Sequence, residues 1–175
     1  MMPPGHIAVG LLSRHLWAEE PDWRGLAGAA LLPDIIDKPL ALLVFTDSHS
    51  TQNIAHSLIV HALVLVIALL WARRALPYVL AFNSHLLADH MWYHTETFWY
   101  PLFGWNTFWQ YKFMNTPQAM VSTYLNILHY PEVWVVEMFA LAYLGWLGWR
   151  WVVTGRQSSA VGNHPTKNRL LKTEN

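Results

Sequence analysis

Histidines and aspartates recur in this chain inside segments that are otherwise apolar. Burying a polar group without a hydrogen-bond partner costs roughly a few kcal/mol of folding free energy, so the fold must bring these side chains to partners. Neutral imidazole and carboxylate are both good ligands for Zn²⁺ and similar divalent cations, which makes a metal ion the expected partner. The groups are His6, Asp34 with Asp37, Asp47 with His49 and His56, and His85 with Asp89, His90 and His94.

The composition indicates a membrane protein of one domain. Charged residues make up 13% of the 175 residues, against a usual share of about 25%. Eleven Trp and seven Tyr add to this signal, because amphipathic aromatic side chains favour the membrane–water boundary. A formal net charge of zero argues against a nucleic-acid partner, and the absence of Cys excludes thiolate ligands, disulfides and cysteine nucleophiles.

Two apolar stretches approach the length of about 20 residues that a membrane-spanning helix needs. They run from Ala55 to Leu76 and from Val133 to Val153; the alternative for each is a buried helix of a soluble protein. We therefore expect an all-α, helical membrane protein with a polar His/Asp cluster between helices.

Residues 1–154 would form the membrane domain, and residues 155–175 a mobile basic tail. The positive-inside rule places that tail, and the adjacent Arg73 and Arg74, in the cytoplasm.

Three further helices are predicted. Gly5–Ala18 is short, Trp23–Leu32 should end where Pro33 disfavours helical geometry in the preceding residue, and Tyr78–Tyr93 is apolar except for its histidines and a few other polar residues. That third helix must turn its polar side into the protein or into a wet cavity. Residues 95–116 are rich in aromatic side chains and are expected to form an irregular interfacial loop.

Individual motifs leave alternatives open. His85 and Asp89 lie four residues apart, so a helix presents them on one face, where they could hold a metal or form a buried hydrogen bond. Asp34 and Asp37 could be ligands, or one of them could cap a short helix. His56 could be a ligand or an exposed residue at a helix start.

Other polar residues receive weaker assignments. His61 points away from His56 on an ideal helix and is interpreted as structural. Glu137, inside an apolar stretch, is a functional candidate or the partner of a histidine. No role is expected for His15, His129 or His164.

In their order, these motifs resemble those of a family of membrane-bound, metal-dependent hydrolases, over roughly residues 5–105. That family shows an early H-x-x-x-G, then L-P-D-x-D, then T-H-S-L opening an apolar helix, then H-x-L-x-D before an aromatic loop. The matching residues here are His6–Gly10, Leu32–Asp34 with Asp37, His56–Leu58, His85–Asp89 and Thr95–Trp105. An extra Ile separates Asp34 from Asp37, and Ala55 replaces the Thr of the pattern.

The resemblance implies a divalent metal, zinc being the one expected, and a distant similarity to zinc-dependent phospholipase C. His6, Asp34, His56, His85 and Asp89 would supply most ligands. Asp37 and His49 would be additional ligands or would orient them, and Asp37 or Glu96 would act as general base. The number of candidates also allows a two-metal site, which suits phosphoester cleavage.

The leading hypothesis is therefore a membrane-embedded, divalent-metal-dependent hydrolase acting on a phosphoester or lipid-like substrate. Its expected location is an inner membrane of bacterial or archaeal type, in contact with membrane lipid, as a homo-oligomer or within a larger assembly. The alternative is a non-catalytic membrane subunit whose histidines ligate a cofactor or pigment. The aspartates disfavour it, because axial ligands of such cofactors are usually His or Met. A transporter is disfavoured by the small number of long apolar stretches.

Overall fold

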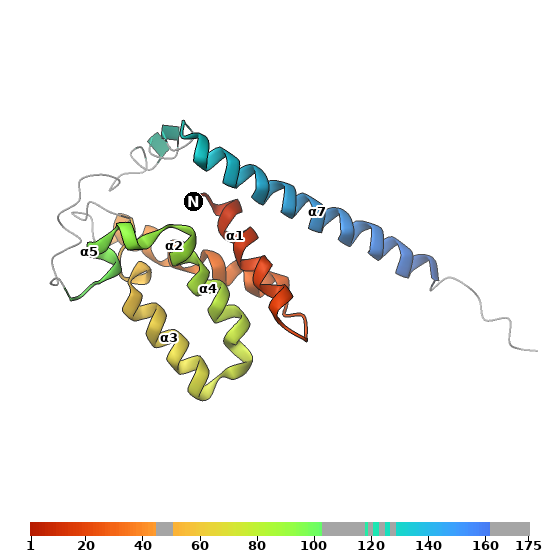
Figure 1. Ribbon diagram of the computed structural model, residues 1–175, viewed down its shortest axis with the longest axis horizontal. Coiled ribbons are helices and arrows are strands. Elements are labelled where there is room, and N and C mark those ends of the chain that lie inside the picture. The colour runs from red at the N-terminus through yellow and green to blue at the C-terminus, as the bar shows by residue number, and fades with distance from the viewer. Residues whose placement is uncertain (45–50, 103–117, 119–120, 123–124, 127–128, 162–175) are drawn as a thin grey trace, which may run out of the picture. The chain divides into compact units, whose positions relative to one another are not determined.

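The computed structural model describes residues 1–44, 51–102, 118, 121–122, 125–126 and 129–161. Every regular element among these residues is a helix, which confirms the expected all-α class. The main elements, shown in Figure 1, are α1 (Pro3–Leu12), α2 (Trp23–Leu43), α3 (Leu58–Trp71), α4 (Leu76–Ala88), α5 (Thr95–Phe98) and α7 (Pro131–Val161). The chain divides into two units, Met1–Leu141 and Ala142–Asn175.

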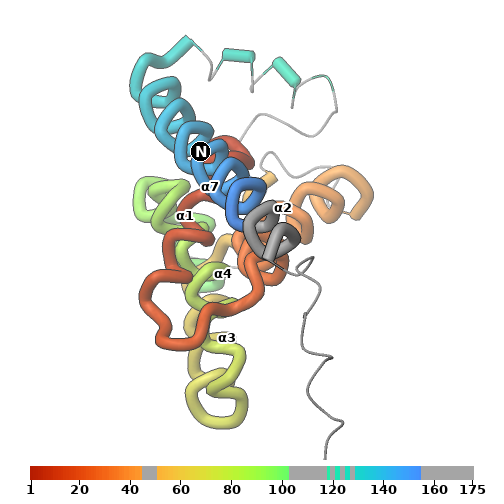
Figure 2. The backbone as a smooth tube through the Cα atoms, turned by 90° about the vertical axis from the view of Figure 1, so that its right-hand side faces the viewer, coloured from red at the N-terminus to blue at the C-terminus, as the bar shows by residue number. Residues whose placement is uncertain are grey.

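Small residues allow α1, α2 and α4 to pack closely. These three helices contact one another, and α3 packs on α4 (Figures 1 and 2). A Cβ atom built on Gly10 of α1 would lie 2.6 Å from Ala30 Cβ of α2, so only glycine fits between the two helices. Leu26, Ala30 and Ala81 are fully buried around this contact. The close approach of these helices brings polar side chains on all three within reach of one another.

Helix α2 runs through Pro33, so the predicted end at Leu32 was wrong. Asp22 caps its first turn by accepting hydrogen bonds from the backbone N–H groups of Arg24 and Gly25. A proline inside a helix costs about 3 kcal/mol, because it removes a hydrogen bond and its ring crowds the preceding turn. Burial of one face of α2 against α1 and α4, including Pro33 itself, offsets this cost.

Two other predicted helices are shorter than expected. The stretch Gly5–Ala18 is helical only as α1, followed by the 3₁₀ turn Ser13–Leu16. The stretch Tyr78–Tyr93 ends as α4 at Ala88, since His90 adopts a left-handed conformation with φ of 51°. A residue in that conformation cannot continue a right-handed helix.

The two predicted membrane-spanning helices are not supported. Among the described residues, no helix combines the length and the apolar character that crossing a bilayer requires. Helix α3 has 14 residues, or about 21 Å at 1.5 Å per residue, against a hydrocarbon core of roughly 30 Å. Helix α7 has 31 residues, but Glu137, Arg150 and its many tryptophans lower its apolar character.

Some expectations concern residues outside the described part of the chain. His49 and Asp47 lie there, as does most of the predicted aromatic loop. The predicted tail begins at residue 155, whereas the backbone of α7 stays helical to Val161. Residues 162–175 lie outside the description.

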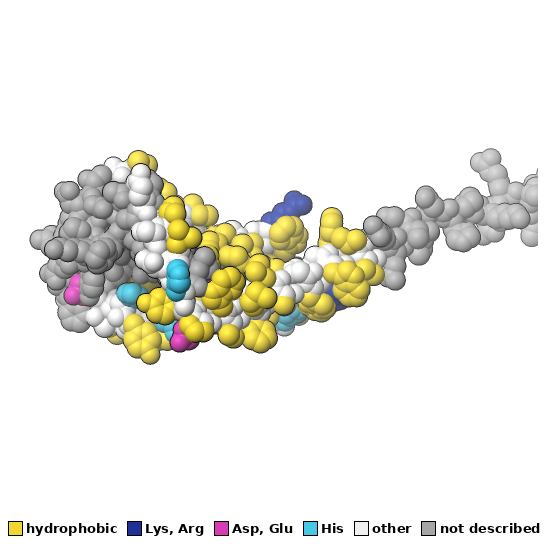
Figure 3. All heavy atoms as spheres, turned by 90° about the horizontal axis from the view of Figure 1, so that it is seen from above, with side chains coloured by type: hydrophobic (Ala, Val, Ile, Leu, Met, Phe, Trp, Pro, Cys, Tyr) yellow, Lys and Arg dark blue, Asp and Glu magenta, His cyan; other side chains and the backbone are white. Residues whose placement is uncertain are grey.

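One face of α3 exposes apolar side chains. Ile59, Leu63, Val66 and Leu70 are each about half exposed or more, and their spacing of four, three and four residues places them on one side of the helix. Arg73 and Arg74 follow in an exposed 3₁₀ turn. In the space-filling view of Figure 3, hydrophobic side chains cover much of the coloured surface, and charged ones are few.

We expect Gly10→Ala to destabilise the fold, because the new methyl group would lie too close to Ala30. Overpacking of this kind costs typically about 1–3 kcal/mol, which exceeds the gain of up to about 1 kcal/mol in helix propensity. Gly28→Ala in α2 is the matched control, since a Cβ there meets no atom within 4 Å. Thermal unfolding of the purified protein should show a lower Tm for Gly10→Ala and an equal or higher Tm for Gly28→Ala. Equal Tm values for both variants would contradict the close α1–α2 contact.

Candidate metal centre

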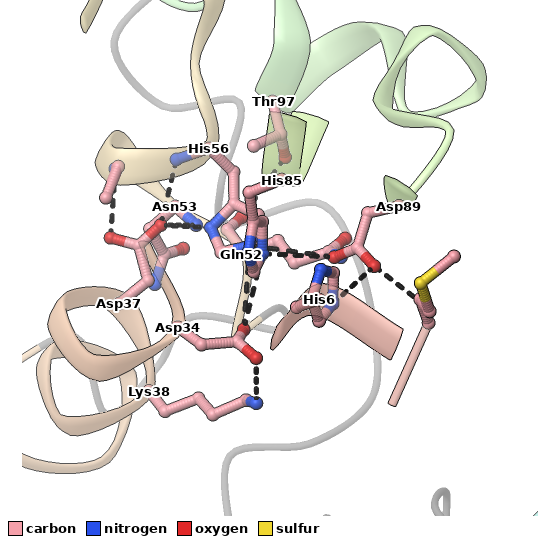
Figure 4. A network of polar contacts seen from close by, with 12 residues as sticks. His6, Asp34, Asp37, Lys38, Gln52, Asn53, His56, His85, Asp89 and Thr97 are labelled. Carbon is pink, nitrogen blue, oxygen red and sulfur yellow. Dashed lines mark hydrogen bonds and ion pairs between the residues drawn. The ribbon is translucent and has the colours of Figure 1, made fainter. Parts of the chain in front are cut away.

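Six of the residues predicted for the site come together where α1, α2, α4 and the 3₁₀ turn Ile54–His56 meet (Figure 4). Each of these elements contributes at least one side chain, and the imidazoles are completely buried. The members of this cluster, called here the His/Asp cluster, are His6 from α1, Asp34 and Asp37 from α2, His56 from the turn, His85 from α4, and Asp89 at the C-terminal end of α4.

Asp37 holds the turn that carries His56. Its carboxylate is fully buried and accepts hydrogen bonds from the backbone N–H groups of Asn53, Ala55 and His56, at 2.7, 3.0 and 3.2 Å. It also lies 2.7 Å from Nδ1 of the His56 ring. The two oxygens of a carboxylate offer about four acceptor positions. Asp37 therefore orients His56. The three backbone N–H groups and the His56 ring together occupy the acceptor positions of the Asp37 carboxylate.

The Asp37 contact determines which nitrogen of His56 carries the proton. An ionised carboxylate only accepts hydrogen bonds, so Nδ1 of His56 must be the donor. In neutral imidazole the other nitrogen, Nε2, then carries a free lone pair. A carboxylate behind a histidine is a common support for metal-ligating imidazoles, because it selects the tautomer and raises the basicity of the ligand atom.

His85 is held in the same tautomer by a backbone group. Its Nδ1 lies 2.7 Å from the carbonyl oxygen of Ala30, which can only accept, so Nδ1 donates and Nε2 is left with a lone pair. A proline inside a helix opens the hydrogen-bond ladder near the preceding turn. Pro33 removes the backbone bond to the Ala29 carbonyl, one residue before the Ala30 carbonyl that His85 uses.

The two Nε2 atoms face each other across 3.1 Å. With both Nδ1 atoms acting as donors, neither Nε2 atom of the neutral rings has a hydrogen to offer, and two lone pairs at this distance repel. Asp34 Oδ1 lies 3.6 Å from His56 Nε2 and 3.9 Å from His85 Nε2. Asp89 Oδ2 lies 3.8 and 3.5 Å from the same two atoms.

A positive charge beside the two facing Nε2 atoms, from a metal ion or from a proton on one ring, would relieve this repulsion. In a tetrahedral zinc site with bonds of about 2.0–2.1 Å, the ligand atoms are separated by about 3.3 Å. The measured separations of 3.1 to 3.9 Å are close to that value. The residues present therefore fit a divalent metal ion held by Asp34, His56 and His85, with the Asp89 carboxylate beside both histidines.

His6 completes the cluster but has no hydrogen-bond partner. Its ring stacks on that of His85, with centroids 3.9 Å apart and planes 9° from parallel. Nε2 lies 3.1 Å from Asp89 Oδ1, but neither ring nitrogen makes a hydrogen bond of acceptable geometry. Buried polar atoms are nearly always paired, so the His6 ring, which meets Asp89 at ion-pair distance without a hydrogen bond, is a candidate metal ligand.

Asp89 is an ionised group at this site. Burial alone would raise the pKa of its carboxyl, but interactions with His6 and His85 and the charge of the Met1 ammonium hold that pKa well below its usual range. Oδ1 lies 2.7 Å from the ammonium nitrogen, and Oδ2 accepts a hydrogen bond from Gln52 at 3.0 Å. The negative charge of Asp89 is therefore available to a cation at neutral pH.

Asp34 marks the more accessible side of the cluster. Its side chain is 13% exposed, whereas the histidine rings are at 0%. Its Oδ2 atom pairs with Lys38 Nζ at 2.5 Å, and Lys38 is 26% exposed.

The sequence interpretation missed Lys38, although its position four residues after Asp34 on a helix could have indicated it. It also missed Gln52, for which no local pattern existed.

Three other candidates lie elsewhere. Glu96 is on α5, and no contact between it and the His/Asp cluster is found in the described part of the chain; its role as a base stays a prediction. Glu137 accepts hydrogen bonds from the backbone N–H groups of Met2 and Gly5, at 2.7 and 3.0 Å, and so caps α1. His61 contacts Asn83 Oδ1 and the Ala55 carbonyl, which confirms its structural role.

Comparison with known proteins identifies the family. A family model described as YdjM inner membrane protein matches residues 1–156. The chain belongs to this family. No curated protein and no solved structure gave a match. Membership in the YdjM family establishes that the chain is one of a group of inner membrane proteins, as the composition and the sequence resemblance indicated.

We expect Asp37→Asn to weaken metal binding by roughly 10- to 100-fold, the usual effect of removing a group that orients a ligand. The asparagine amide can donate to His56 Nδ1, which would move the ring proton to Nε2 and block the ligand atom. Zn²⁺ affinity measured by competition with a chelator tests this, with Asp22→Asn as a control outside the cluster. Unchanged affinity in a folded Asp37→Asn protein would contradict the tautomer assignment.

Proposed function

We propose that this member of the YdjM family is a membrane-associated, divalent-metal-dependent hydrolase acting on a phosphoester or lipid-like substrate. The observation that carries the proposal is the pair of Nε2 lone pairs of His56 and His85, facing each other at 3.1 Å beside two carboxylates. A divalent ion at such a site supplies Lewis acidity and lowers the pKa of bound water, the usual basis of metal-assisted hydrolysis.

The side chains around the ligand set divide into orienting and accessible groups. Asp37 and the Ala30 carbonyl orient His56 and His85 from the buried side. Asp34 and Lys38 lie on the accessible side. A substrate would therefore approach past Lys38, whose positive charge favours an anionic group such as a phosphoester.

The choice of general base follows from the same contacts. The sequence favoured Asp37 or Glu96. The hydrogen bonds of Asp37 support an orienting role instead, and Glu96 has no contact with the His/Asp cluster among the described residues. Asp34 is the carboxylate better placed to act as general base, because its Oδ2 atom is turned to Lys38 rather than to the buried histidines.

A lipid-like substrate agrees with the membrane location of the family. The exposed apolar face of α3, from Ile59 to Leu70, would lie against acyl chains. Trp71 is 77% exposed at the end of this face, and Arg73 and Arg74 follow it, so aromatic and basic side chains stand where a helix in the interface meets the headgroups. This arrangement would hold the protein near its substrate.

We expect the purified, detergent-solubilised protein to hold at least one divalent ion per chain. Asp34→Ala and His85→Ala should lose most of it, because each removes a ligand atom. Elemental analysis by mass spectrometry measures the content, and His129→Ala, which removes an exposed histidine that contacts the Leu125 carbonyl, is the control. Wild-type protein without a stoichiometric ion would overturn the proposal. A visible absorbance band in its place would support the alternative, a cofactor-binding subunit.

We expect Lys38→Met to lower the rate of phosphodiester hydrolysis at least several-fold, through a raised KM, while the metal content stays near that of the wild type. The substitution removes a positive charge beside the substrate path but no ligand atom. The assay uses bis(p-nitrophenyl) phosphate and, in parallel, an uncharged p-nitrophenyl ester. An equal loss on both substrates would contradict an electrostatic role of Lys38 in anion binding.

A further inference from the structure

We propose that the His/Asp cluster holds a second divalent cation beside His6, with the carboxylate of Asp89 bridging the two ions. This inference rests on the proposed function, since it presumes a first ion among Asp34, His56 and His85. It goes further by assigning His6 to a separate site and by defining a binuclear centre. The stacking of two rings, the position of one carboxylate and the ring nitrogens of His6, which make no hydrogen bond, support it.

The stacked rings of His6 and His85 cannot serve one ion well. Their planes are 9° from parallel, and their centroids are 3.9 Å apart. The lone pair of an imidazole nitrogen lies in the plane of its ring, so two nearly parallel rings direct their lone pairs to separate points. Metal ions in two-metal hydrolytic sites stand about 3.5–4 Å apart, a spacing that two nearly parallel rings with centroids 3.9 Å apart can serve if each binds its own ion.

The Asp89 carboxylate offers one oxygen to each ring. Oδ1 lies 3.1 Å from His6 Nε2, and Oδ2 lies 3.5 Å from His85 Nε2. The ring of His85 cannot itself join two ions, because its Nδ1 is bound to the Ala30 carbonyl. Asp89 is thus the group placed to connect a site that contains His85 with a site that contains His6.

His6 supplies an independent sign of a missing partner. Its side chain is fully buried, and both ring nitrogens lack a hydrogen bond. The capping of α1 by Glu137 holds the backbone of Gly5, next to His6, in place. A buried imidazole kept in a defined position, with a carboxylate oxygen at 3.1 Å but no hydrogen bond, is the arrangement expected of a metal ligand.

The Met1 ammonium is the rival for this position. Its nitrogen lies 2.7 Å from Asp89 Oδ1, the oxygen that the second ion would use. The contact shows that this oxygen accommodates a positive charge. An ion bound to His6 and to Asp89 Oδ1 would have to replace the Met1 ammonium. The chain would then bind two divalent ions, whereas it would bind one if the ammonium stayed in place.

Metal stoichiometry separates the two cases. We expect two divalent ions per chain in the full-length wild-type protein loaded with Zn²⁺ or Mn²⁺ and then desalted. His6→Asn should hold one ion, His85→Ala should lose the first site, and His129→Asn should keep both ions. Circular dichroism of each variant checks that its helices are retained.

Electron paramagnetic resonance of the Mn²⁺-loaded wild type provides a readout that does not depend on any variant folding. We expect the signal of two spin-coupled Mn²⁺ ions, and an uncoupled six-line spectrum for His6→Asn. One uncoupled ion in the wild type would overturn the second site and leave the proposed function intact, with the ammonium balancing Asp89. No bound ion at all would overturn both.

Discussion

The buried carboxylate of Asp37 is the contact on which the rest of the His/Asp cluster depends. It satisfies three backbone N–H groups of the turn before α3 and, through His56 Nδ1, decides which nitrogen of that ring is free. Without it, the turn would have unpaired backbone donors in a buried place, each costing about 1–3 kcal/mol. The same interaction thus stabilises the local fold and prepares a ligand atom.

Packing and chemistry are joined through α2. The helix continues past Pro33, and this continuity places Asp34 and Asp37 one turn apart, where one faces the accessible side and the other the buried turn. The Ala30 carbonyl near the proline orients His85. Gly10 lets α1 approach α2, which brings His6 onto the ring of His85. The positions that allow close helix contacts are therefore also those that assemble the cluster.

Local sequence patterns predicted part of this arrangement. The four-residue spacing of His85 and Asp89 was sufficient to place them together, because helix periodicity is a local property. The all-α class followed from long apolar stretches for a similar reason. The ends of the helices could not be predicted from local patterns. Helix α2 continues past a proline, α4 ends before a left-handed histidine, and α3 is too short to cross a bilayer. These boundaries depend on tertiary burial, which outweighs local propensity.

The sequence by itself determined the chemical identity of the site: which imidazoles and carboxylates stand in apolar surroundings, and that such groups need a common partner. Only the tertiary structure decided their roles. The direction of each histidine lone pair is set by its other nitrogen, and the partners of those nitrogens, Asp37 for His56 and the Ala30 carbonyl for His85, come from segments 19 and 55 residues away. No local pattern encodes a hydrogen bond to a distant backbone carbonyl, so the convergence of the two Nε2 atoms arises from tertiary contacts, both helix packing and the hydrogen bonds of Asp37.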